Sequence, residues 1–160
     1  MTRRRWFLPE TPDVLGLLRS QVAVTIEGLD AFGAWAAGDP AAAEGVRDAE
    51  HRGDAAKREL LTALRVAFVT PLEPEDVFAL SRGIDRLLNH ARELINESEA
   101  MACPPDARIA EMASLLAGAL RHIDTAIVAR RHARHQPNVA SGDPKRCPRR
   151  RPWAPLPHLP

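Results

Sequence analysis

The chain has 160 residues, enough for one domain with a buried core, and it is rich in Ala, Leu and Arg, with no Tyr and four Phe. This composition favours helices and argues against a β-sheet domain, because it supplies few of the residues that strands prefer. The net charge is +1, but residues 1–129 hold 14 basic and 20 acidic side chains, whereas residues 130–160 hold 8 basic and 1 acidic.

The first 40 residues contain a predicted arm and a predicted helix. Residues 1–10 are expected to be a flexible arm; its three arginines resemble the start of a signal peptide, but no apolar segment follows them. A helix is predicted from about Thr11, which would cap it. One face of this helix is apolar at three- and four-residue spacing: Leu15, Leu18, Val22, Ile26, Leu29 and Phe32. Gly38 ends it, because glycine tolerates a left-handed conformation.

A second helix is predicted from about Pro40 to Phe68. Its inward-facing seam is polar in the first half and apolar in the second: Val46, Glu50, Gly53, Lys57, Leu61, Leu64 and Phe68. A glycine inside a helix costs about 1 kcal/mol relative to Ala, which is tolerable where a partner helix, a ligand or an ion must approach closely. The turn Thr70–Asp76 carries helix-start signals, including a capping-box spacing, so a third helix is predicted to begin at Pro71 or Pro74 and to extend to about Met101.

The last part of the chain contains one more helix and a tail. Pro104 and Pro105 interrupt the chain, and Asp106 can cap a fourth helix, which is predicted to fray near residue 135. Residues 136–160 include seven prolines and no periodicity, so they are expected to be a disordered basic tail. The predicted fold is therefore all-α, an up-down bundle of about four helices over residues 11–135.

Several features bear on the cellular setting. No apolar run approaches the ~20 residues that span a bilayer. The two cysteines, Cys103 and Cys147, stand apart, without a second cysteine or histidine at metal-ligand spacing. We therefore expect a soluble, cytoplasmic protein without a disulfide framework.

Acidic and amide side chains occupy matching positions on the two arms of the predicted hairpin. Glu50 and Asp54 on one arm, and Asp85 and Asn89 on the other, are each four residues apart, so each pair projects from one side of its helix. Oxygen ligands that converge from neighbouring helices are typical of carboxylate metal sites, and a metal ion would account for carboxylates on a core-facing seam. The alternative is that the first pair is solvated or forms ion pairs with neighbouring cations: Arg52, Lys57 or Arg58.

The residues around these pairs form a longer pattern. It consists of Glu50-His51-Arg52-Gly53-Asp54, the apolar run Leu60–Phe68, the turn Thr70–Asp76, and Ile84-Asp85-Arg86-Leu87-Leu88-Asn89. In this order and spacing, the pieces resemble the PhoU-like phosphate transport regulators, more closely the branch that accompanies Pit-type phosphate transporters, over about residues 12–130. That family repeats its three-helix unit, and this chain resembles a member truncated after the first repeat.

The resemblance implies a metal site and a function. The ligands would be Glu50, Asp54 and Asp85, with Asn89 as a weak fourth, and the ion would be iron, zinc, manganese or magnesium. Arg86 stands at an acidic position of the family motif, and an amide brings no charge, so a lower metal affinity is expected. The implied role is a non-enzymatic accessory or regulator of inorganic phosphate transport that binds a Pit-type phosphate transporter or another membrane transport component, peripherally at the inner face of the membrane.

Two alternatives of other kinds remain open. One is a metal-free helical interaction module, in which two copies form a homodimer that covers an open face of the bundle. The other is a ferritin-like carboxylate-metal enzyme, against which the absence of a Glu-xx-His pair stands. Nucleic acid is not expected as a partner, because the tail offers no aromatic residue beyond Trp153 for base stacking. Histidines of the fourth helix are weaker candidate ligands, since lone helical histidines usually lie on the surface: His122, His132 and His135.

Overall fold

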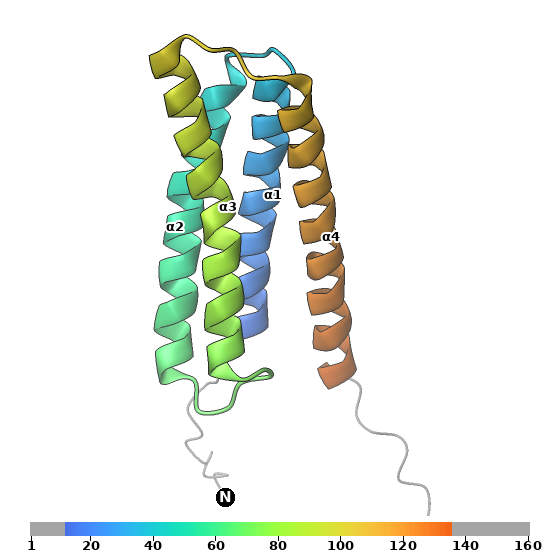
Figure 1. Ribbon diagram of the computed structural model, residues 1–160. Coiled ribbons are helices and arrows are strands. Elements are labelled where there is room, and N and C mark those ends of the chain that lie inside the picture. The colour runs from blue at the N-terminus through green and yellow to red at the C-terminus, as the bar shows by residue number, and fades with distance from the viewer. Residues whose placement is uncertain (1–11, 136–160) are drawn as a thin grey trace, which may run out of the picture.

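The computed structural model describes residues 12–135, so the predicted arm (1–10) and tail (136–160) lie outside the described residues. Four helices follow one another: α1 (Val14–Ala36), α2 (Ala42–Val66), α3 (Pro74–Met101) and α4 (Ala107–His135). They run alternately up and down (Figure 1), and no strand occurs between residues 12 and 135. The predicted all-α, up-down bundle of four helices is confirmed.

The start and the end of α1 follow local backbone chemistry. Asp13 caps the helix, with its carboxylate accepting a hydrogen bond from the Gly16 N–H at 2.9 Å. The predicted cap, Thr11, lies outside the described residues. At the other end Gly38 has a φ of +107°, in the region that glycine adopts most readily, which confirms the predicted end of the helix.

The end of α2 differs from the prediction. The helix ends at Val66 because Ala67 turns to an extended conformation, with φ −70° and ψ 117°. Phe68, predicted on the buried seam, therefore lies in the loop with 91% of its surface exposed. The apolar half of the seam is also shifted by one residue, since Leu60 is fully buried and Leu61 is half-buried.

Helix α3 begins at Pro74, the second of the two predicted starts, and not at Pro71. The predicted capping box does not form: the Thr70 hydroxyl donates to the Leu72 carbonyl at 2.6 Å, and Glu73 occupies the cap position without a side-chain hydrogen bond. Pro74 has no N–H to satisfy, so it suits the first turn. At α4, the Asp106 carboxylate accepts the Arg108 N–H, as predicted for a cap.

Helix α1 is the centre of the bundle, because it packs against each of the other three helices, whereas α2 packs on α1 and α3. Two apolar clusters fill the interior. The larger includes Leu18, Val22, Leu60, Ile84 and Leu120, and the smaller is built around Phe32 and Trp35, whose rings stack with centroids 5.5 Å apart.

A polar pair and a close helix approach fix the position of α3. The Gln21 amide donates to the Ser81 carbonyl at 3.0 Å, and the Ser81 hydroxyl donates back to the Gln21 amide oxygen at 2.8 Å, in the buried interface of α1 and α3. Leu88 of α3 fills the space above Gly28 and Gly53, where an added Cβ would come within 2.4 and 3.1 Å of its methyl groups. Gly53 therefore admits a partner helix, one of the reasons considered for its place in α2.

Helix α4 has the least support. Among the four helices, its backbone lies close only to α1, and ion pairs hold it there: Arg19 with Asp124 at 2.7 Å and Arg121 with Asp30 at 2.6 Å. By length and composition alone, Ala107–Ala133 is apolar enough to cross a membrane, and 22% of its most apolar window is buried. The expectation of a soluble, cytoplasmic protein stays a prediction. An apolar surface of α4 faces solvent, with Leu115 69% exposed.

Candidate functional site

Four polar side chains face one another where α2 crosses α3. Asp54 and Lys57 come from α2, and Asp85 and Asn89 come from α3; all four are half-buried. The two helices come close here because Gly53 leaves room for Leu88, so the adjacent polar residues lie within hydrogen-bonding distance. We call Asp54, Lys57, Asp85 and Asn89 the hairpin cluster.

The ammonium group of Lys57 is the centre of the hairpin cluster. Its Nζ donates to Asp85 Oδ1 at 2.7 Å and to Asp54 Oδ1 at 2.9 Å. Asn89 donates from Nδ2 to the second oxygen of Asp85 at 3.2 Å. The side chain of Lys57 is 23% exposed and that of Asp85 is 16% exposed, so these bonds are partly shielded from water. One cation thus joins a carboxylate of α2 to a carboxylate of α3.

The cluster changes the acidity of its members. The hydrogen bond from Lys57 lowers the pKa of Asp54 below its usual 3.8, although burial opposes this. Burial by itself lowers the pKa of Lys57, but the hydrogen bonds to Asp85 and Asp54 outweigh it and raise that pKa above the usual 10.5. At neutral pH, Lys57 is therefore charged and its interaction with the two carboxylates is at full strength.

Glu50, the remaining predicted ligand, belongs to a different contact. It is one turn before Asp54 on α2, its side chain is 7% exposed, and its Oε1 lies 3.0 Å from an η nitrogen of Arg92 on α3. Its other oxygen is 3.4 Å from the Nδ1 of His51. In the described part of the chain, the Nε of Arg92 is the buried side-chain polar atom without a hydrogen-bond partner. Glu50 is thus neutralised by its own cation, outside the hairpin cluster.

The four predicted ligands do not form one donor set in this arrangement. Asp54 and Asp85 converge on a single point, but the Lys57 ammonium occupies it; Glu50 pairs with Arg92, and the amide of Asn89 directs a donor, not its oxygen, at Asp85. Over residues 12–135, no group of three or more His, Cys, Asp and Glu side chains has a metal-binding arrangement. A cation would fit only after Lys57 had left, so the metal site remains a prediction. The alternative considered for Asp54, an ion pair with a neighbouring cation such as Lys57, matches the contact in the structure.

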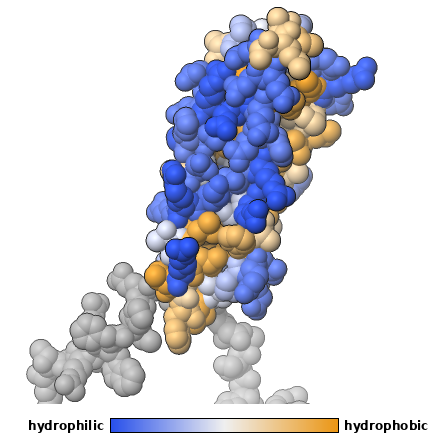
Figure 2. All heavy atoms as spheres, turned by 60° about the vertical axis from the view of Figure 1, so that its left-hand side comes forward, coloured by the Kyte–Doolittle hydropathy of each residue, from blue (hydrophilic) through white to orange (hydrophobic). Residues whose placement is uncertain are grey.

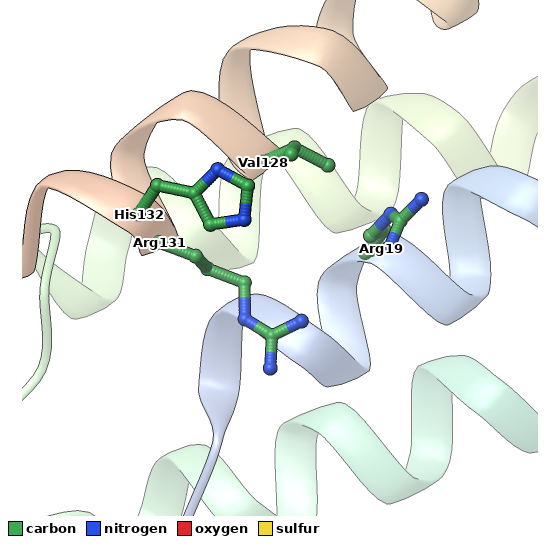
Figure 3. Close-up of a pocket in the computed structure, with 4 residues that line it drawn as sticks. All are labelled: Arg19, Val128, Arg131 and His132. Atoms are coloured by element: carbon green, nitrogen blue, oxygen red, sulfur yellow. The ribbon is translucent and has the colours of Figure 1, made fainter. Parts of the chain in front are cut away.

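The weaker candidates lie elsewhere. His122 is exposed, and His132 lines a recess of about 270 Å³ between α1 and α4, together with Arg19, Val128 and Arg131 (Figure 3). Two arginines beside it make this recess unsuitable for a metal cation. Cys103 is an exposed free thiol. Cys147 and the side chain of His135 lie outside what the structure describes.

Sequence reasoning missed the role of Arg92 and underestimated that of Lys57. Lys57 stood on the predicted seam and among the possible ion-pair partners, but its simultaneous contact with Asp85 depends on the stagger of α2 against α3. Arg92 is seven residues after Asp85, two helical turns along the same face. An arginine two turns after Asp85, on the helix that faces Glu50, is the sequence signal that could have indicated the Glu50–Arg92 pair.

Comparisons with models of protein families, with curated proteins and with solved structures give no match to this chain.

Proposed function

We propose that this chain is an accessory or regulatory protein of inorganic phosphate transport that acts by binding other proteins and catalyses no reaction itself. The observation that carries the proposal is the order and spacing of four sequence pieces that resemble the PhoU-like regulators: Glu50–Asp54, Leu60–Phe68, Thr70–Asp76 and Ile84–Asn89. All four lie on the α2–α3 hairpin and its turn. The partner would be a Pit-type phosphate transporter or another membrane transport component, met at the cytoplasmic face of the membrane.

The hairpin provides a suitable surface for such an interaction. Figure 2 shows a hydrophilic surface over most of the height of this side of the molecule. Exposed charged residues of both helices lie outside the hairpin cluster, including Arg58 on α2 and Arg86 on α3. The cluster beneath joins the two helices through Lys57, so a partner would meet a surface with a fixed register. Fixed geometry lowers the entropic cost of forming a specific interface.

A metal-free helical interaction module is the second candidate function, and a specific observation favours it. Lys57 and Arg92 already supply the positive charges that the carboxylates of α2 and α3 require. Helix α4, with Met112 and Leu115 exposed, offers an apolar surface that a homodimer would cover. This candidate differs from the first in its partner, a second copy of the chain, and in needing neither metal nor transporter.

Phosphate uptake tests the first candidate. Cells that lack this chain are complemented with the wild type, with the Asp54→Asn/Asp85→Asn double variant, or with Arg108→Gln as a control whose side chain is exposed. We expect the wild type and the control to restore the normal response of uptake to phosphate supply, and the double variant to fail while its helical circular dichroism is retained. Unchanged uptake in cells without the chain would refute the proposal.

Molar mass and metal content separate the two candidates. Elemental analysis of tag-free protein, beside a Glu50→Ala/Asp54→Ala variant, tests for the predicted iron, zinc, manganese or magnesium. A metal-free particle of twice 17.6 kDa by light scattering would favour the interaction module. A monomer with stoichiometric metal that is lost in the variant would exclude that module and would show that Lys57 is displaced.

A further inference from the structure

One end of the bundle exposes a concentrated apolar surface. Val66 at the end of α2 is 72% exposed, Phe68 and Val69 of the α2–α3 connection are 91% and 54% exposed, and Phe78 in the second turn of α3 is 42% exposed. We call these four residues the apolar tip. A recess of about 270 Å³ lies beside them, lined by Leu61, Leu64, Arg65, Pro74 and Phe78. Figure 2 shows the corresponding apolar area at the lower end of the molecule, below the hydrophilic surface.

Both ends of the described chain lie at the same end of the bundle as the apolar tip. In Figure 1, α1 begins and α4 ends beside the α2–α3 connection. Two contacts agree with this placement: Arg131 of α4 pairs with Asp13 at the start of α1, and Arg130 donates to the Pro71 carbonyl at 3.3 Å. The residues at which the two terminal segments join the bundle therefore lie at the same end as the apolar tip.

The terminal segments are strongly basic by sequence. Residues 1–11 contain three arginines and residues 136–160 contain five lysines and arginines, against two acidic residues, Glu10 and Asp143. Apolar and aromatic residues accompany them, including Trp6, Phe7 and Trp153. A surface that attracts this end of the molecule must therefore accept apolar side chains and must also be negatively charged.

We infer that the apolar tip docks on an anionic lipid bilayer. Phe68 and its neighbours enter the interface between head groups and acyl chains, and the basic terminal segments are drawn to the negative surface. Neither contribution is sufficient by itself, because a single small apolar insertion or a short basic segment binds membranes weakly, and stable attachment takes two signals. This docking does not depend on the proposed role in phosphate transport.

The charges of the described residues near the tip decide between a bilayer and a nucleic acid. Within Val66–Phe78 no side chain is basic, and three are acidic, at the start of α3: Glu73, Glu75 and Asp76. The positive end of the α3 dipole offsets part of their charge. Two arginines border this segment: Arg65 lines the recess, and the guanidinium carbon of Arg82 lies 5.7 Å from the centre of the Phe78 ring. A nucleic acid needs basic groups in its contact surface, whereas a bilayer needs apolar groups there and accepts positive charge at the periphery. The tip therefore favours the bilayer.

Sedimentation of the full chain with vesicles tests the inference. The vesicles consist of phosphatidylcholine alone or of phosphatidylcholine mixed with phosphatidylserine. We compare the wild type with Phe68→Ser/Val69→Ser and with Leu115→Ser, a control that removes an apolar side chain of α4 that is 69% exposed. Because the altered side chains are more than half exposed, all variants are expected to fold, and circular dichroism checks this.

We expect the wild type and Leu115→Ser to bind the anionic vesicles, less strongly at high salt, and to bind the neutral vesicles weakly. Phe68→Ser/Val69→Ser should bind the anionic vesicles at least about tenfold more weakly, since transferring one such side chain from water contributes roughly that factor. Equal binding of the tip variant and the wild type would overturn the inference, as would no binding by the wild type. Preferential binding to single-stranded RNA, or equal loss in the Leu115→Ser control, would also overturn it.

Discussion

Replacing Lys57 by Met tests whether this side chain is the resident cation of the hairpin cluster. Methionine keeps the length and the apolar stem of lysine but removes the ammonium group, leaving Asp54 and Asp85 to face each other. The lost hydrogen bonds are short, at 2.9 and 2.7 Å, and bonds to charged groups contribute about 1.5–3 kcal/mol each. The Asp54 side chain is 37% exposed and can form hydrogen bonds with water in the variant, so we count only the bond to Asp85 in full.

We therefore expect the free energy of unfolding at pH 7 to fall by about 1–3 kcal/mol in Lys57→Met, less than the loss of a partner from a fully buried ion pair. Urea titration followed by circular dichroism measures it. Arg108→Met is the charge-matched control, because the Arg108 side chain is 91% exposed. If both variants unfold at the same urea concentration, Lys57 is solvated and the reasoning fails.

The pH dependence of this difference follows from the two pKa shifts. Asp54 has a pKa lowered below 3.8 in the folded state, so its stabilisation is present above that pH and is lost as the pH falls further. Lys57 has a pKa raised above 10.5, so its stabilisation is present below that pH and is lost as the pH rises through the folded-state value. The stability difference between the wild type and Lys57→Met should be constant between about pH 5 and pH 9 and should shrink outside that range.

Metal addition gives the same variant a second readout. Without the ammonium group, the two carboxylates require another cation, so Mn²⁺ should raise the melting temperature of Lys57→Met and leave that of the wild type unchanged. An equal rise in both proteins would show that metal displaces Lys57 or binds elsewhere. An Asp85→Asn change in the Lys57→Met background should abolish the rise if the ion occupies the lysine's place.

Three further substitutions test the packing. Gly28→Ala should lower the free energy of unfolding by about 1–2 kcal/mol, because the added methyl group overlaps side chains of α2 and α3. Gly83→Ala should raise it by up to about 1 kcal/mol, because nothing lies within 4 Å of the added methyl group. Equal effects of the two variants in urea titrations would contradict the close approach of the helices at Gly28. Ser81→Ala should cost about 1–3 kcal/mol, because it leaves the buried Gln21 amide oxygen without its donor, and an unchanged melting temperature would contradict this. Phe68→Ser should change stability by less than about 0.5 kcal/mol by calorimetry, since Phe68 is 91% exposed, and a larger loss would place it in the core.

The fold could be predicted from the sequence because its main signals are local. Apolar spacing, Gly38 and Asp106 each act over a few residues, and the helices they delimit correspond closely to the structure. The end of α2 could not be placed as well, since the apolar residues continue to Val69 and periodicity alone does not distinguish a last helical turn from an exposed loop. The exposure of Phe68 depends on how the loop turns away from the bundle.

The candidate site depends on distance relations that the sequence does not contain. The i, i+4 spacing placed Glu50 beside Asp54 and Asp85 beside Asn89, but the axial stagger of α2 against α3 decides which side chains meet across the hairpin. In the structure that stagger brings Asp85 to Lys57 and brings Arg92 to Glu50. The Gln21–Ser81 pair was missed for the same reason, since its partners are 60 residues apart and neither belongs to a local motif.

The isolated position of α4 has a consequence for the dynamics of the chain. Because its backbone approaches α1 alone, α4 can detach without separating α2 from α3 and without disturbing the hairpin cluster. Amide hydrogens of α4 should then exchange with deuterium through a sub-global opening, earlier than those of α2 and α3, while the amides of α1 remain protected. Such an opening exposes the part of α1 that α4 covers for as long as the helix is away. The population of that open form would set the fraction of time for which the chain is available to proteases and to aggregation.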